Sequence, residues 1–271
     1  MRDEEKTKDQ LLGELQQSRE EFKKFTYIVS HDLRTPLINL KGFSAEMRFA
    51  VETVQTAIEP ILSQLDETQR SAVITAIERD IPESLEFIES SVSRIDAFMN
   101  AVLRLSRLSR RELKLEPIDM DVLVQSAIDS LSDEIKQYQA KVSVKSPLPE
   151  TVADRASMLE VVEAILKNAV AYQAAGRPGE IEVAGERGPD EIVFTVRDNG
   201  RGIAEGDMYK VFEPFRRAGK QDIPGEGMGL IYAQTLIRLH GGRVTCESEL
   251  GEGTMVTFTV SNHLAEGGGY A

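Results

Sequence analysis

Three side chains with the potential for nucleophilic chemistry lie close together at His31, Asp32 and Thr35. On a helix, His31 and Thr35 share a face, because residues four apart lie one above the other. A neutral imidazole has a nucleophilic nitrogen, and a neighbouring carboxylate can fix its tautomer and accept its proton. Pro36 has no N–H to donate to the Asp32 carbonyl, so we expect the helix to bend or loosen after the histidine. The alternative is a solvent-facing histidine followed by an accidental helix break.

Two glycine-containing segments in the second half of the chain suggest a binding site. Asp198-Asn199-Gly200-Arg201-Gly202 follows a predicted strand. A carboxylate at a strand end can accept a hydrogen bond from an exocyclic amine, and glycines let a planar ring approach the backbone. A tight turn is the alternative. Gly225-Glu226-Gly227-Met228-Gly229-Leu230 opens a predicted helix, where backbone N–H groups can surround a phosphate, although glycine-rich loops are common.

Asn168 is a polar residue on an otherwise largely apolar helix face, which also carries Ala164, Ile165 and Tyr172. Its amide is either a core group with satisfied hydrogen bonds or a ligand. The amide oxygen suits a Mg²⁺ ion that bridges phosphates, because hard cations take oxygen ligands. Together, Asn168 and the two glycine-containing segments favour a nucleotide site more strongly, by their order and spacing, than any of the three alone.

Composition restricts the class of protein. A chain of 271 residues is long enough for about two domains, and 41% hydrophobic and 28% charged residues fit a folded soluble protein. The net charge of −13 disfavours nucleic acid as a partner. No apolar run approaches the ~18 residues of a membrane span, and no signal peptide opens the chain. The single cysteine, Cys246, excludes an internal disulfide and suits a reducing compartment, so we expect a cytoplasmic location.

Residues 1–115 are predicted to be helical. Before the histidine, apolar residues spaced three and four apart form a heptad seam, which needs a partner helix. The seam consists of Leu11, Leu15, Phe22, Phe25 and Val29, with one polar interruption at Ser18. We therefore expect a coiled-coil helix over residues 1–25 and a homodimer; packing of this helix on its own domain is the alternative. The first helix is expected to reach about Leu65.

A second helix is expected from about Glu67 to Leu108, after a turn and helix start at Asp66-Glu67-Thr68. Pro82 is predicted to kink or divide it, with Asp80 capping the downstream half. The pattern predicts an antiparallel hairpin, of which two copies would form a four-helix bundle. The apolar stripe of this second helix, which is predicted to be core, consists of Phe87, Val92, Ile95, Phe98, Val102, Leu105 and Leu108.

Beyond a charged segment ending at Glu116-Pro117 the pattern becomes mixed α and β. Helices are expected at about 120–138, which Asp119 can cap, at 154–172, which Asp154 starts, and at 228–239. Strands are expected at about 141–145, 180–184, 192–197, 243–248 and 254–260. The predicted fold class is thus multidomain, an α-helical hairpin followed by an α/β sandwich. The predicted domains are residues 1–25, 26–115 and 116–262, with a tail at 263–271.

In order and spacing, these segments resemble the two-component sensor histidine kinases over about residues 17–260. Arg107-Leu108 and His240-Gly241-Gly242 are also similar to family patterns. The family's H box matches Ser30–Leu37, its N box Asn168-Ala169, its first glycine box Asp198–Gly202, its F box Glu213-Pro214-Phe215 and its second glycine box Gly225–Leu230.

The resemblance implies a dimeric helical hairpin followed by a gyrase-type ATPase domain, with ATP and Mg²⁺ as cofactors. His31 would be the phosphoacceptor, Asp32 the neighbouring acid/base and Thr35 a residue for dephosphorylation. Asp198 would recognise adenine and Asn168 would bind Mg²⁺. The other residues implied to bind the nucleotide are Tyr172, Gly200, Gly202, Ile203, Arg216, Arg217, Lys220, Gly225, Gly227, Met228, Gly229 and Leu230.

The resemblance also implies partners. The phosphoryl group would pass to an aspartate in the receiver domain of a separate response regulator, because no receiver-like acidic cluster is evident in this sequence. A sensory domain upstream of this chain is implied, and any membrane association would come from segments outside it.

Two alanines on the predicted ATP-facing helix depart from the family pattern. Many relatives have asparagine at the position of Ala164 and lysine at that of Ala171, so one metal ligand and one phosphate cation are missing. These losses leave open a dimeric nucleotide-binding scaffold without phosphotransfer. A serine kinase or chaperone-like ATPase is less favoured, because it would need neither His31 nor the hairpin. The segment between Phe215 and Gly225 corresponds to the family's ATP lid and is short here. We hypothesise that Arg216, Arg217 or Lys220 in this lid compensates for the missing phosphate cation and metal ligand.

Replacement of the compensating cation is predicted to weaken nucleotide binding, because it removes a positive charge that would pair with phosphate. Nucleotide affinities of Arg216→Ala, Arg217→Ala and Lys220→Ala, each compared with the unchanged chain, test this. Equal affinity in all four proteins would reject compensation by the lid.

Overall fold

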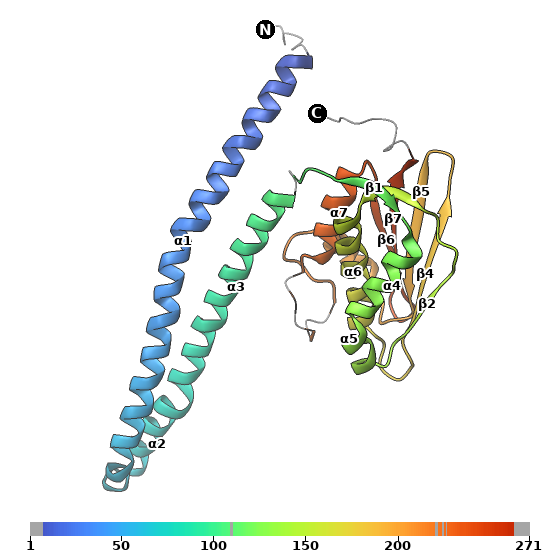
Figure 1. Ribbon diagram of the computed structural model, residues 1–271. Helices are drawn as coiled ribbons and strands as arrows, with labels where there is room; N and C mark the ends of the chain where they lie inside the picture. Colours follow the sequence, from blue (N-terminus) through green and yellow to red (C-terminus); the bar gives the residue numbers. More distant parts are fainter. Residues whose placement is uncertain (1–7, 109–110, 220–221, 224, 226, 263–271) are drawn as a thin grey trace. The chain divides into compact units, whose positions relative to one another are not determined.

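The computed structural model describes residues 8–108, 111–219, 222–223, 225 and 227–262 (Figure 1). It contains two compact units that divide between Ser106 and Arg107. The first unit is a helical hairpin and the second an α/β domain, which confirms the predicted fold class. Three earlier predictions lie outside the residues whose side chains are described. They concern the heptad seam as far as Phe25, the lid residue Lys220, and the tail at 263–271. No described helix combines the length and apolar character of a membrane span.

The first arm of the hairpin is a single long helix. Helix α1 (Lys8–Ile58) continues through Pro36, so the expected loosening after the histidine does not interrupt it. It ends before the predicted Leu65, and the chain tightens into the 3₁₀ segment η1 (Glu59–Gln64). Pro60 explains this end, because its missing N–H leaves the i−4 carbonyl without a partner.

The second arm begins at the predicted cap. The Asp66 carboxylate accepts a hydrogen bond from the Gln69 amide at 2.8 Å and starts α2 (Glu67–Thr75). A π-helical turn, η2 (Ala76–Asp80), then joins α2 to α3 (Ile81–Leu108). Of the expected kink or division at Pro82, the division is wrong, because the chain stays helical through the π turn just before the proline; the expected cap at Asp80 is wrong as well, since Asp80 lies within that turn. Asp80 instead pairs with Arg79 at 3.0 Å.

The two arms pack antiparallel through a narrow core. Leu37 of α1 packs with Val92 and Met99 of α3. Arg48 forms an ion pair with Glu89 at 2.8 Å, on the side of this cluster toward the turn. The hairpin is therefore held by apolar contacts near the histidine segment and by a charged pair farther along.

Much of the predicted α3 core stripe is exposed within one chain. Val92 and Leu108 are buried and Val102 and Leu105 half-buried, but three members of the stripe are exposed, Phe87 (69%), Ile95 (45%) and Phe98 (49%). The prediction that the whole stripe is core is thus wrong for a single hairpin, because two helices can cover only a narrow strip of each other. On α1, Phe43, Met47 and Phe49 are also exposed.

The second unit has two layers, with its helices on one face of a five-stranded sheet (Figure 1). Strand order in the sheet is β2-β4-β5-β7-β6, in which only the β2–β4 pair is parallel. The strands are β2 (Lys141–Val144), β4 (Glu180–Arg187), β5 (Glu191–Asp198), β6 (Val244–Glu249) and β7 (Gly253–Ser261). The helices are α4 (Met120–Ser130), α5 (Ser132–Gln137), α6 (Arg155–Ala171) and α7 (Gly229–Leu239).

Caps and alternating burial explain most of these elements. Asp119 accepts from the Val122 amide at 3.1 Å and Asp154 from the Ser157 amide at 2.8 Å, which starts α4 and α6 as expected. Alternate residues of β5 are buried, and Phe194 stacks on Phe258 of β7 with ring centroids 5.1 Å apart. The sheet therefore turns one apolar face toward the helices.

Four features of this unit were not predicted. Strands β1 (Leu115–Ile118) and β3 (Thr151–Asp154) form a separate antiparallel pair. The predicted helix over 120–138 is divided at Leu131, and a 3₁₀ segment, η3, covers Glu205–Phe212. Strand β1 begins at Leu115, one residue before the expected domain start at residue 116. A four-residue strand gives only a weak periodic signal, and Pro117 within β1 argues against a strand.

Candidate nucleotide-binding site

The carboxylate of Asp198 lies at the end of β5 and has one oxygen available to a ligand. Its Oδ1 accepts hydrogen bonds from the backbone amides of Gly200 at 2.8 Å and Thr254 at 3.3 Å. No other group in the described part of the chain donates to this side chain. The second oxygen can therefore accept a hydrogen bond from a donor outside the protein, such as an exocyclic amine.

The surroundings of Asp198 make its ionisation sensitive to a bound donor. Burial raises the pKa of Asp198 to about 6, against the lowering effects of the Gly200 and Thr254 amides and the charge of Arg177. A donor that hydrogen-bonds to the second oxygen would favour the ionised form. Asp198 is therefore suited to recognise a neutral N–H donor rather than a second anion.

The loop after β5 packs its main chain directly against two other parts of the backbone. The Arg201 amide donates to the Tyr172 carbonyl at 3.0 Å, and a Cβ on Gly200 would lie 2.4 Å from that same oxygen. Gly202 has φ of 63°, and a Cβ there would lie 1.9 Å from the Glu249 carbonyl oxygen. Both positions require glycine, because any side chain would force the backbones apart.

Two residues that brace this loop were not singled out from the sequence. The Arg177 guanidinium donates to the carbonyls of Asn199 at 2.8 Å, Gly200 at 2.9 Å and Gly251 at 2.6 Å. The Asn199 side chain accepts from the Glu180 amide at 2.8 Å and donates to a carbonyl just before β4. Arg177 lies in an irregular segment with no local pattern, so only the tertiary structure reveals its role.

Helix α6 contacts both the loop after β5 and the beginning of α7. Tyr172, its C-terminal cap, contacts the loop after β5, whereas a Cβ on Gly229 would lie 3.8 Å from the Cβ of Ala164. Asn168 is between these two contacts and on the same face, because 164, 168 and 172 are four residues apart. Its half-buried side chain has no hydrogen-bond partner among the described residues. The structure thus brings Asn168, Asp198 and the glycine segment together along one helix.

The beginning of α7 can accept an anion. Met228 precedes α7 and is buried, and no side chain caps this end among the described residues. Gly229 and Leu230 are therefore at a helix N-terminus whose first N–H groups have no intrahelical acceptor. Gly225 and Gly227 both have positive φ, of 158° and 70°. Such an N-terminus favours a phosphate group through its N–H donors and its dipole.

Other predicted residues have structural contacts. The Ile203 amide donates to the Ser248 hydroxyl at 2.9 Å, which fixes the backbone after Gly202. The Arg201 guanidinium lies 4.7 Å from the centroid of the Tyr172 ring and pairs with Asp222 at 2.7 Å. Tyr172 is therefore held by a cation–π contact at the edge of the site.

The lid cations differ in their surroundings. Arg216 is exposed, with its Nε 3.6 Å from the Glu213 carboxylate. Arg217 donates to the Ile223 carbonyl and is half-buried, so it holds the lid backbone together. Arg216 is thus better placed than Arg217 to pair with a phosphate, and compensation by the lid stays a prediction.

No cluster of three acidic, histidine or cysteine side chains suited to a metal ion occurs among the described residues. A Mg²⁺ ion bound to nucleotide phosphates needs few protein ligands, because phosphate and water oxygens complete its coordination. The unpartnered amide of Asn168 fits this role.

In the hairpin, the predicted acceptor side chains lie on the surface. His31 Nδ1 is 3.1 Å from Asp32 Oδ1, and the two side chains are 69% and 70% exposed. Thr35, four residues farther along α1, is also exposed. A carboxylate at Nδ1 keeps the proton on that nitrogen and makes Nε2 the nucleophilic nitrogen.

The comparisons with known proteins agree with this geometry. Residues 153–263 match the family described as histidine kinase-, DNA gyrase B- and HSP90-like ATPases. Over 92% of its length the chain is 33% identical to the methanogenesis regulatory histidine kinase FilI of Methanothrix harundinacea (strain 6Ac), of which it covers 26%. It is 29% identical over 93% of its length to cyanobacterial phytochrome A of Nostoc sp. (strain PCC 7120), covering 30% of that protein. The chain thus spans between a quarter and a third of these relatives.

Its fold is similar to that of full-length ShkA, crystallised with AMPPNP, with a TM-score of 0.56, 24% identity, and coverage of 88% of this chain and 45% of ShkA.

Adenosine affinity is expected to fall as the pH is lowered through about 6, because protonated Asp198 loses its acceptor. Below the pKa the decline approaches about tenfold per pH unit. Adenosine is the probe, because it has no phosphate that titrates in this range. Titrations between pH 5 and 8 test this, with Asp198→Asn as the control that removes the pH dependence. A flat wild-type profile would contradict the assignment of Asp198.

Proposed function

The chain has the two-part architecture of a sensor histidine kinase, with a gyrase-type ATPase domain, and we propose that it transfers the γ-phosphoryl group of ATP to His31. The main support is that three groups without a protein partner among the described residues lie along one helix: the second oxygen of Asp198, the amide of Asn168 and the start of α7. These groups match the amine, metal-binding and phosphate parts of Mg-ATP, respectively.

The nucleotide would be held in two parts. The exocyclic amine of adenine would donate to Asp198, whose Oδ1 is already held by the Gly200 amide. The phosphates would accept hydrogen bonds from the N–H groups at the start of α7. Mg²⁺, held by Asn168 and the phosphates, would offset the negative charge on the transferring group.

His31 would act as the nucleophile. Its Nε2 would attack the γ-phosphorus, the new N–P bond would form, and the bond to the β,γ-bridging oxygen would break, so that ADP leaves. Asp32, 3.1 Å from Nδ1, would retain the proton there and stabilise the positive charge that develops on the ring. Exposure of both side chains gives a phosphoryl donor access to the imidazole.

The phosphoryl group would then pass to an aspartate in the receiver domain of a response regulator. Thr35, exposed on the same face of α1, would position water when the kinase dephosphorylates that partner. Because ATP is the donor, we expect these reactions in the cytoplasm. The relatives are longer than this chain, which covers 26% and 30% of them, and we propose that a sensory domain upstream of this chain accounts for part of the difference.

A homodimer would cover the exposed apolar side chains of the hairpin. Phe43 and Met47 of α1 and Phe87, Ile95 and Phe98 of α3 are all more than two-fifths exposed in one chain. Removal of such side chains from water favours association. A second hairpin packed on this surface would complete a four-helix bundle.

One observation favours the alternative of a nucleotide-binding scaffold. Ala164 lies beside Gly229 at the start of α7, so the position one turn before Asn168 supplies no side-chain oxygen that could assist it in binding Mg²⁺. A scaffold would bind ATP and dimerise without modification of His31.

Phosphorylation of His31 distinguishes the two functions. After incubation with Mg-ATP, intact-mass spectrometry at alkaline pH is expected to show one added phosphoryl group on the wild-type chain, located to the peptide that contains His31. His31→Gln is expected to lose the modification entirely. Lys41→Gln, an exposed substitution on the same helix, is the matched control and is expected to keep it. An unmodified wild type that still binds ATP would favour the scaffold.

A further inference from the structure

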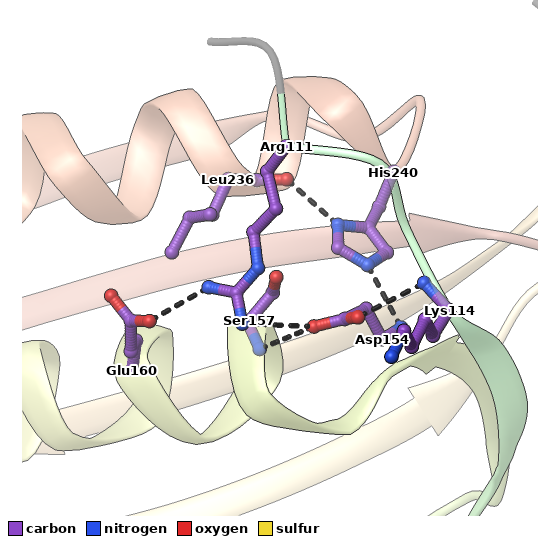
Figure 2. A network of polar contacts seen from close by, with 7 residues as sticks. All are labelled: Arg111, Lys114, Asp154, Ser157, Glu160, Leu236 and His240. Atoms are coloured by element: carbon purple, nitrogen blue, oxygen red, sulfur yellow. Dashed lines mark hydrogen bonds and ion pairs between the residues drawn. The ribbon is translucent and has the colours of Figure 1, made fainter. Parts of the chain in front are cut away.

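A buried imidazole links the two helices that carry the candidate phosphate site. His240 follows α7 and is completely buried (0% exposed). Its Nδ1 lies 2.7 Å from the Leu236 carbonyl oxygen, and its Nε2 lies 3.1 Å from the backbone nitrogen of Asp154 (Figure 2). Because the Asp154 N–H is a donor, Nε2 must be the acceptor. Nδ1 then carries the proton and donates it to Leu236.

The other end of this link is also fixed. Asp154 immediately precedes α6 and caps it, and its Oδ2 accepts from the Lys114 amide at 3.0 Å. Arg111 lies 3.6 Å from Oδ1 of the same carboxylate and pairs with Glu160 of α6 at 2.8 Å (Figure 2). The Asp154 backbone therefore cannot shift without breaking several polar contacts, so the His240 bond has a firm support.

Helices α6 and α7 run antiparallel, so this link lies at the end away from the phosphate site. The C-terminal end of α7 is bonded to the start of α6, whereas the N-terminal end of α7, at Gly229, lies beside Ala164. Asn168 is one helical turn beyond Ala164. One turn corresponds to about 5.4 Å, and hydrogen bonds and metal ligands tolerate displacements of only about 0.5 Å. A small slide of α7 along α6 would thus separate Asn168 from the phosphate donors.

Asp198 does not depend on this link. It lies at the end of β5 and is held by amides of the following loop and of β7. A change in the register of α7 against α6 would therefore affect the phosphate part of the site and leave the adenine part in place.

We propose that His240 is a positioning residue for nucleotide binding, which holds the glycine segment at the start of α7 in register with Asn168 by accepting a hydrogen bond from Asp154. The identity of the ligand, Mg-ATP, rests on the proposed function above. Burial, the largest influence, lowers the pKa of His240, and the nearby Arg111 charge lowers it further; the Leu236 carbonyl and Asp154 oppose both. The net lowering keeps Nε2 an acceptor at neutral pH.

Two substitutions separate the link from the packing. In His240→Gln the amide oxygen can approach the position of Nε2 and accept from Asp154. In His240→Asn the amide can approach the position of Nδ1 and keep the Leu236 bond, but it is too short to reach Asp154. Leu236→Val, a cavity substitution at the same end of α7, is the control for general destabilisation, because it leaves both backbone contacts of His240 in place.

The full chain would be titrated with Mg-AMPPNP and, separately, with adenosine. His240→Asn is expected to weaken Mg-AMPPNP binding by about tenfold, in the range of one lost buried hydrogen bond, and adenosine binding less than about twofold. His240→Gln and Leu236→Val are expected to stay within about threefold of the wild type for both ligands. Equal losses for the two ligands, equal losses in the Asn and Gln variants, or no loss in any folded variant would overturn the proposal.

A measurement on the wild type covers the case in which His240→Asn does not fold. Coupling between two sites is reciprocal, so Mg-AMPPNP is expected to slow hydrogen exchange of the Asp154 amide, and adenosine is not. Unchanged exchange with saturating Mg-AMPPNP would overturn the positioning role. If the wild type binds neither ligand, the proposed function fails instead, so the two failures are distinguishable.

Discussion

The candidate nucleotide site depends on a main-chain contact between the loop after β5 and the end of α6. The Tyr172 carbonyl accepts from the Arg201 amide at 3.0 Å, and the Arg201 carbonyl accepts from the Gly251 amide at 2.9 Å. Backbones can approach this closely only because Gly200 and Gly202 have no side chains. The contact joins the helix layer to the sheet at the point where Asp198 ends β5.

Although this contact joins the two layers, the proposed adenine and phosphate parts of the site have different supports. Asp198 and the loop are braced by Arg177 and by the turn between β6 and β7, all belonging to the sheet side of the domain. Asn168 and the start of α7 belong to the helix layer, whose register is set at the far end by His240 and Asp154. The affinity for a nucleotide that spans both parts would depend on both supports, whereas the affinity for adenosine would depend only on the support of Asp198.

Local signals in the sequence predicted much of the fold and the site. Asp66, Asp119 and Asp154 were recognisable as helix caps, because a cap depends on residues only three apart. Each glycine segment alone has a structural alternative, and the candidate site residues were assigned because the segments together, in their order, resemble the motifs of the sensor histidine kinases. Their convergence on α6 follows from the topology of the sheet, which single motifs do not encode.

The features that were missed all depend on distant partners. Strands β1 and β3 pair with each other across α4, α5 and β2, and Arg177 acquires its role only when three carbonyls gather around it. His240 was noted only as part of a family pattern, because a histidine before two glycines carries no sign of its bond to Asp154. The apolar stripe of α3 was predicted to be core, but the sequence does not distinguish burial within a chain from burial between chains.

The central claim is that the ATPase domain delivers a phosphoryl group to the exposed imidazole of His31, and radiolabelled ATP tests it most directly. The chain would be incubated with Mg-ATP labelled at either the γ- or the α-phosphate, denatured, and counted. The account predicts retention of the γ label alone, stable to alkali and lost in acid, as expected for a phosphorylated imidazole. No retained γ label, or equal retention of both labels, would contradict it.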